Sequence, residues 1–113
     1  MLTGDVHANY VCNIERDYGE PESSELVAAE FVCTSISTGG DGVDQSAGDQ
    51  VVLAENPHIA FVNRQRGYVR CTLNRGQWRS DFRVVPFVTQ PGAPVVTRAS
   101  FVVEDGIPGA KEA

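Results

Sequence analysis

The stretch that decides the fold is YVRCTLNRGQWRSDFRV, residues 68–84. Apolar and polar residues alternate on both sides of a short polar break, which is the pattern of a half-buried β-hairpin. If Leu73 pairs with Trp78, the apolar side chains lie together on one face, and Arg70 lies opposite Asp81 on the other. A shift of one residue would place Leu73 against a polar partner. The pattern therefore predicts both the hairpin and its register.

Outside the hairpin, the ends of the chain give weaker patterns. Residues 1–3 are expected to be the last residues of a strand that began upstream, because stable strands usually have about five or six residues. Residues 9–25 suit a surface loop whose first part is packed. A last strand is expected at residues 97–104, with its apolar residues facing inward. The tail over residues 106–113 is expected to be frayed.

Between the first segment and the hairpin, the sequence predicts a strand, a glycine-rich loop and one short helix. The strand is expected over residues 30–37, which are rich in β-branched and aromatic residues, and it leads into the glycines of residues 39–42. The helix is expected over residues 44–55, with Asp44 as its N-cap and a proline after its end. Its apolar residues at helical spacing are Ala47, Val51 and Ala54.

Length and composition exclude several kinds of protein. A chain of 113 residues has room for one domain with a thin core. The net charge of −6 argues against a nucleic-acid-binding surface, because Lys and Arg would have to neutralise phosphates. No apolar run approaches the ~20 residues of a transmembrane helix, and no signal peptide is visible in this chain. Three widely spaced cysteines encode neither a zinc knuckle nor a complete disulfide framework.

The sharpest chemical signal is Asp5-Val6-His7, directly after the first strand residues. On a strand, residues two apart point to the same side with Cα atoms ~6.7 Å apart, so both side chains can reach one metal ion or a pair. A carboxylate and an imidazole suit a hard or borderline divalent or ferric ion. By itself this tripeptide occurs more often in surface turns than in metal sites, so the rest of the chain decides its meaning.

Five blocks of sequence follow one another in a specific order and spacing. They are residues 2–7 (LTGDVH), 30–37 (EFVCTSIS), 56–59 (NPHI), 65–72 (QRGYVRCT) and 97–103 (TRASFVV). Together the blocks resemble the C-terminal part of PhoD-type alkaline phosphatases over nearly the whole chain. One departure is Cys33, where glycine would be expected before the glycine-rich loop, and it affects local packing only.

The resemblance implies membership of the calcineurin-like metallophosphoesterase group. The expected fold is an α+β or α/β fragment, mainly β, that forms the C-terminal part of a four-layer αββα sandwich. The expected activity is hydrolysis of phosphate monoesters, and often diesters, by a metal-activated water, with calcium and iron as the implied cofactors. The group's last metal motif resembles residues 4–7, which makes Asp5 a metal ligand and His7 a ligand or a phosphate contact.

The resemblance also implies that residues 1–113 are a single partial domain. The family's earlier metal-ligand segments have no counterpart here, and a metal ion needs about three or four protein ligands to be held firmly. The chain is therefore expected to need the upstream part of the same domain and to be inactive alone. Family members are secreted, periplasmic or at the cell surface, and this localisation is carried over as an expectation.

Three further features each have two interpretations. His58 is a candidate for substrate binding, although ordering of its turn is the simpler role. Residues 39–42 form either an anion-binding nest of backbone N–H groups or a plain flexible loop beside the cleft. Alternation places Arg70, Arg79 and Arg83 on one face with Asp81, which favours a solvated or cross-strand-paired face. The other interpretation is a phosphate-binding cluster of five arginines. They are Arg64, Arg66, Arg70, Arg79 and Arg83. The alternative function is a non-catalytic β-rich binding or interaction module, in which Asp5 and His7 are incidental.

Overall fold

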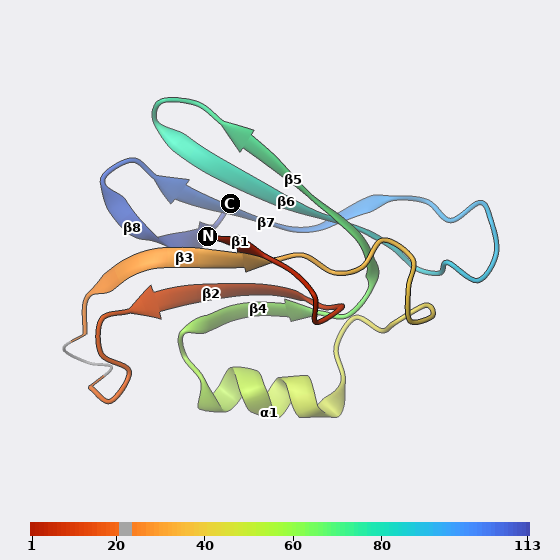
Figure 1. Ribbon diagram of the computed structural model, residues 1–113, viewed down its shortest axis with the longest axis horizontal. Helices are drawn as coiled ribbons and strands as arrows, with labels where there is room; N and C mark the ends of the chain where they lie inside the picture. Colours follow the sequence, from red (N-terminus) through yellow and green to blue (C-terminus); the bar gives the residue numbers. More distant parts are fainter. Residues whose placement is uncertain (21–23) are drawn as a thin grey trace.

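Two four-stranded β-sheets pack against each other in the computed structural model, which describes residues 1–20 and 24–113 (Figure 1). The first sheet has the spatial order β1 (Leu2–Thr3), β3 (Leu26–Val32), β2 (Asn9–Glu15) and β4 (Ile59–Asn63). The second sheet has the order β5 (Arg66–Leu73), β6 (Gln77–Val85), β7 (Val96–Glu104) and β8 (Ile107–Glu112). Helix α1 (Ala47–Glu55) lies next to β4. The prediction of a mainly β segment with one short helix is confirmed.

The predicted hairpin is β5 and β6, in the predicted register. Leu73 pairs with Trp78, and Arg70 pairs with Asp81. β6 is an inner strand of the second sheet, because β7 pairs along its other edge. Alternation thus determined which face of this sheet is buried, since a shift of one residue in the register would move its apolar side chains to the other face.

Aromatic side chains from both sheets form the centre of the core. Phe82 on β6 is fully buried, and its ring centroid lies 5.2 Å from that of Phe61, 6.3 Å from that of Phe101 and 6.5 Å from that of Phe31. These distances fall in the range of favourable aromatic pairs. Phe31 and Phe61 belong to the first sheet and Phe101 to the second, so Phe82 joins the two layers.

The polar face of the hairpin is cross-strand paired. Asp81 is 3% exposed and accepts hydrogen bonds from Arg70 Nη2 at 3.1 Å, Arg79 Nε at 2.9 Å and Ser100 Oγ at 2.5 Å. Burial raises the pKa of Asp81, but these donors outweigh it and hold the pKa below its ordinary value. The cross-strand interpretation is therefore confirmed for Arg70 on β5, whereas Arg79 pairs with Asp81 from the same strand, two residues away.

Residues 9–25 were wrongly expected to form a surface loop. β2 occupies Asn9–Glu15 and lies between β3 and β4 in the first sheet. The strand was not predicted because several of its residues are polar. One of them, Asn9, is buried, and its side chain donates a hydrogen bond to Asn63 rather than facing water. Part of the expected loop, residues 21–23, lies outside the described residues.

The third strand and the C-terminal tail also differ from expectation. The strand expected over residues 30–37 is β3, which starts earlier and ends at Val32. The tail expected to fray over 106–113 forms β8 instead, paired with β7. A two-residue turn at Asp105-Gly106 connects them, with Gly106 at φ 75°. Asp-Gly is among the strongest short hairpin signals, so the turn chemistry explains the extra strand.

The short helix begins later than expected and buries a different face. Its N-cap is Ser46 rather than Asp44, and Ser46 forms a capping box with Asp49. Asp49 is 1% exposed, whereas Val51 is 54% exposed, so the apolar spacing assigned the wrong face. No helix among the described residues is long and apolar enough to cross a membrane.

Asp49 faces inward because Arg64 binds it. Arg64 donates from Nε at 2.7 Å and from Nη2 at 2.8 Å to the two carboxylate oxygens. These hydrogen bonds, against the opposing effect of burial, lower the pKa of Asp49 to about 2. The unfolded chain has the ordinary value of about 3.9. Because the folded pKa is the lower one, the pair stabilises the fold above about pH 4, and this stabilisation is lost as pH falls towards 2.

We predict that Asp49→Asn lowers the free energy of unfolding by about 2 kcal/mol near neutral pH and flattens its dependence on pH between about 4 and 2. Denaturant unfolding at a series of pH values measures both effects. Asp44→Asn is the matched control, because its ion pair with Arg98 is exposed and worth about 1 kcal/mol or less, and the asparagine oxygen can still accept the hydrogen bond from Asn63. If the free energy of unfolding falls between about pH 4 and 2 as steeply in Asp49→Asn as in the wild type, this pair does not determine acid stability.

Candidate metal-binding bend

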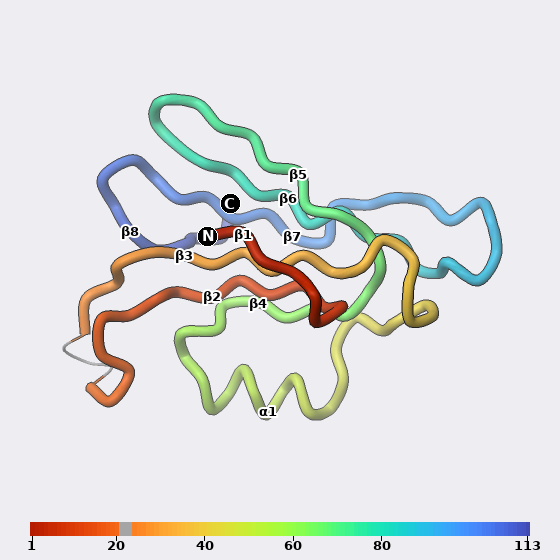
Figure 2. The backbone as a smooth tube through the Cα atoms, in the orientation of Figure 1, coloured from red at the N-terminus to blue at the C-terminus, as the bar shows by residue number. Residues whose placement is uncertain are grey.

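Asp5 and His7 lie on a bend that connects β1 to β2. β1 is parallel to β3 and ends where Thr3 pairs with Val32, whereas β2 is antiparallel to β3 on its other side. Residues 4–8, here called the bend, therefore cross the end of β3 and reverse the chain direction (Figure 2). The backbone from Asp5 to His7 is therefore a bend and not the extended strand end that the spacing of two residues assumed.

The backbone of the bend is left-handed at both candidate ligands. Asp5 has φ 77° and His7 has φ 55°. Few non-glycine residues adopt positive φ, although Asp and His are among those that tolerate it best. Each such residue costs on the order of 1 kcal/mol and persists where the surrounding structure holds it, often at functional sites. The backbone is therefore strained at the two residues that are predicted to bind metal.

The two side chains are exposed and provide two ligand groups of suitable chemistry. A carboxylate and an imidazole fit calcium and iron respectively. In the part of the chain that the structure describes, no group of three or more His, Cys, Asp or Glu residues is placed to hold a metal ion. The donor types therefore fit the implied metals, and the number of donors falls short of the three or four that firm binding needs.

The buried side chain of Arg66 is hydrogen-bonded to the backbone of the bend. Arg66, at the start of β5, donates from Nη1 to the backbone carbonyl of His7 at 2.9 Å and to Ser35 Oγ at 2.8 Å. Its Nη2 donates to the carbonyl of Arg64 at 3.0 Å. Sequence reasoning grouped Arg66 with four other arginines and missed this role, because residues 7 and 66 are far apart in the chain.

The glycine-rich loop lies beside His7. A Cβ atom at Gly39 would stand 3.6 Å from His7 Nδ1 and 3.9 Å from Arg66 Nη1. Gly42, at φ 71°, has no room for a side chain, since a Cβ there would lie 2.0 Å from the carbonyl oxygen of Arg64. Asp41 anchors the loop by accepting hydrogen bonds from the backbone N–H groups of residues 88 and 89. The loop therefore borders the bend and is hydrogen-bonded to the backbone at residues 88 and 89.

His58 lies at the opposite end of the first sheet. β2 and β4 are antiparallel, with Asn9 opposite Asn63 near the bend and Cys12 opposite Ile59 at the far end. The carbonyl of His58 accepts a hydrogen bond from the backbone N–H of Asn13 at 2.7 Å, and its ring packs edge-on against Tyr18. The structure does not bring His58 together with Asp5 and His7, and its contacts are those of a residue that orders a turn.

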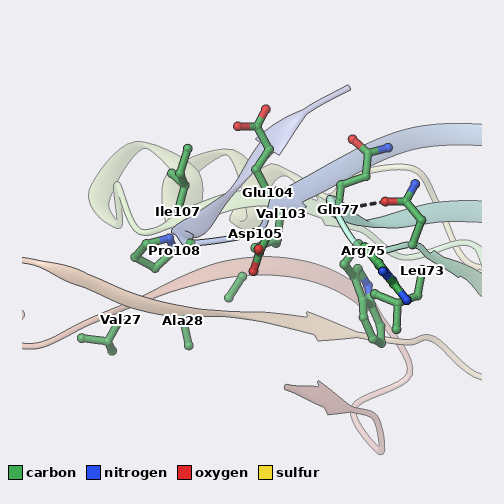
Figure 3. A pocket seen from close by; sticks show the side chains of 14 residues that line it. Val27, Ala28, Leu73, Arg75, Gln77, Val103, Glu104, Asp105, Ile107 and Pro108 are labelled. Carbon is green, nitrogen blue, oxygen red and sulfur yellow. Dashed lines mark hydrogen bonds between the residues drawn. The ribbon is translucent and has the colours of Figure 1, made fainter.

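One groove among the described residues is also remote from the bend. A groove of about 600 Å³ opens between the start of β3 and the turns of the second sheet, with Val27 and Ala28 on one side and Ile107 and Pro108 on the other (Figure 3). Because the bend crosses the other end of β3, the groove and the candidate metal ligands belong to different regions of the molecule.

Comparison with known proteins shows the family to which this chain belongs. Residues 1–82 match the family model for PhoD-like phosphatases, and the chain belongs to this family. Alkaline phosphatase D of Bacillus subtilis (strain 168) is 55% identical over 104 residues, which are 92% of this chain and 18% of that protein. A solved structure described as "Structure of PhoD" matches 99% of this chain and 21% of its own, with a TM-score of 0.92 and 51% identity.

The comparisons confirm the resemblance and the mainly β segment. The chain spans about a fifth of the length of these two relatives. The activity of a whole PhoD-type protein is therefore only proposed for this chain.

Proposed function

We propose that this chain is a segment of a metal-dependent phosphatase that hydrolyses phosphate esters with a metal-activated water. The observation that supports this most directly is that Asp5 and His7, in a chain of the PhoD-like family, share one strained bend held by Arg66 and bordered by the glycine-rich loop. Backbone strain at residues with exposed ligand groups is often found at functional sites, and it motivates the proposal for Asp5 and His7.

In the proposed mechanism, each side chain of the bend has a separate task. Asp5 would hold one metal through its carboxylate, and His7 would bind a metal or contact the phosphate through its imidazole. Calcium and iron would supply charge neutralisation for the transferring oxygens and a lowered pKa for the attacking water. Arg66 keeps the peptide of His7 in place, so that the bend need not reorganise as negative charge develops on the substrate.

The 113-residue chain alone is expected to show no turnover of a chromogenic phosphomonoester, even with calcium and iron supplied. Two candidate ligands are fewer than a firmly held metal needs, and the described residues add no third donor beside them. The positive control is a longer PhoD-type polypeptide that contains this segment, assayed for turnover and for bound metal in parallel. Measurable metal-dependent turnover by the short chain would contradict the proposal that further segments complete the site.

A further inference from the structure

Arg66 is a buried cation whose hydrogen-bond partners among the described residues are all neutral groups. It is 6% exposed, and its contacts are carbonyl oxygens and hydroxyl groups. Arg64, by contrast, pairs with Asp49, and Arg70 pairs with Asp81. No ion pair to Arg66 is found within residues 1–20 and 24–113, and its buried Nε has no hydrogen-bond partner there. Burying a guanidinium without a carboxylate is costly, so its position needs a reason.

The guanidinium connects three segments that are distant in the chain. Its Nη1 reaches the His7 carbonyl at 2.9 Å, Ser35 Oγ at 2.8 Å and Thr34 Oγ1 at 3.4 Å, and its Nη2 reaches the Arg64 carbonyl at 3.0 Å. The bend, the connection after β3 and the approach to β5 thus meet at one planar group. Arginine suits this task because its donors are fixed in a fork, whereas lysine offers a single ammonium on a flexible stem.

We infer that Arg66 is a positioning residue for the bend. Its hydrogen bond to the carbonyl of His7 fixes the peptide group that follows this left-handed residue. The exposed side chains of Asp5 and His7 therefore each keep a fixed orientation. This inference rests on the proposed function for its catalytic consequence. The rigidity of the bend does not depend on metal, so it is tested separately.

The first experiment measures backbone motion of residues 5–8 in the full chain by ¹⁵N relaxation, without metal. Arg66→Met removes the fork and the charge, and Arg66→Lys keeps the charge alone. In Arg66→Met we expect order parameters in the bend to fall from ~0.85 to below ~0.6, with the β5–β6 hairpin unchanged, and in Arg66→Lys to fall part of the way. Arg64→Lys is the matched control, because it disturbs the contact with Asp49 and leaves the bend ordered. A bend as rigid as wild type in folded Arg66→Met overturns the inference, and if that variant does not fold, Arg66→Lys decides by the same criterion.

The second experiment uses a longer PhoD-type polypeptide that contains this segment. Arg66→Met is expected to lower kcat/KM by about 10- to 100-fold, with partial recovery in Arg66→Lys and none of the loss in Arg64→Lys. If Asp5→Ala abolishes activity and Arg66→Met leaves it intact, the inference fails and the proposed function stands. If Arg66→Met loosens the bend and Asp5→Ala has no effect on activity, the proposed function fails, and Arg66 still positions the bend.

Discussion

Replacing Asp5 by alanine in a longer PhoD-type polypeptide that contains this segment is expected to lower kcat/KM by more than about 100-fold, since loss of groups that merely orient metal ligands already costs 10- to 100-fold. The carboxylate is exposed on the bend, so its removal leaves the core untouched. Turnover of a chromogenic phosphomonoester and metal content per chain measure the effect. Both are expected to fall together, because Asp5 is proposed to hold metal.

Backbone strain is the main confounding cause in that experiment. Asp5 has φ 77°, and alanine tolerates this conformation less well than aspartate does. Asp5→Gly is therefore the decisive control, because glycine accepts positive φ without cost and also lacks the carboxylate. Loss of activity in both variants supports a ligand role. Activity near wild type in Asp5→Gly would assign the loss in Asp5→Ala to the backbone and remove Asp5 from the metal site. Asp17→Ala, an exposed carboxylate elsewhere on the surface, is expected to behave as wild type.

Local patterns predicted the parts of the fold that local chemistry determines. The register of β5 and β6 followed from alternation, because burial of one face excludes a shift of one residue, and from the pairing of Arg70 with Asp81. β8 was missed although its signal, Asp105-Gly106, is in the sequence, since the short segment after it has little apolar alternation. β2 was missed for a different reason. Its buried Asn9 has its partner in Asn63, 54 residues away, and no pattern within β2 shows this bond.

The same division applies to the candidate site. A spacing of two residues singled out Asp5 and His7, but it assumed an extended backbone that the reversal of direction between β1 and β2 does not permit. Arg66 was visible only as one of several arginines. Its importance comes from a contact with His7 that spans 59 positions, and such a contact depends on how the two sheets pack. The sequence could therefore name the candidate ligand groups, whereas the contact of Arg66 with the bend depends on the folded structure.

Phe82→Ala is expected to lower the free energy of unfolding by about 3–5 kcal/mol, the usual cost of removing a buried phenylalanine. Phe82 is fully buried, and its ring contacts aromatic rings from both sheets, so the cavity would open at the junction of the two layers. Domains of this size have total stabilities of about 5–15 kcal/mol, so the variant would lose a large share. Denaturant unfolding followed by the fluorescence of Trp78, the single tryptophan of the chain, measures the loss.

Two controls decide whether that loss reports on the junction between the sheets. Leu73→Ala truncates an apolar residue on the neighbouring strand that is 68% exposed, and it is expected to change stability by no more than about 0.5 kcal/mol. Phe82→Leu keeps most of the buried volume and is expected to cost clearly less than alanine, because the penalty grows with the cavity left behind. If Phe82→Ala costs less than about 1.5 kcal/mol, the aromatic cluster is not what holds the layers together. The contacts between β3 and β8 would then be the alternative, since they also join the two sheets.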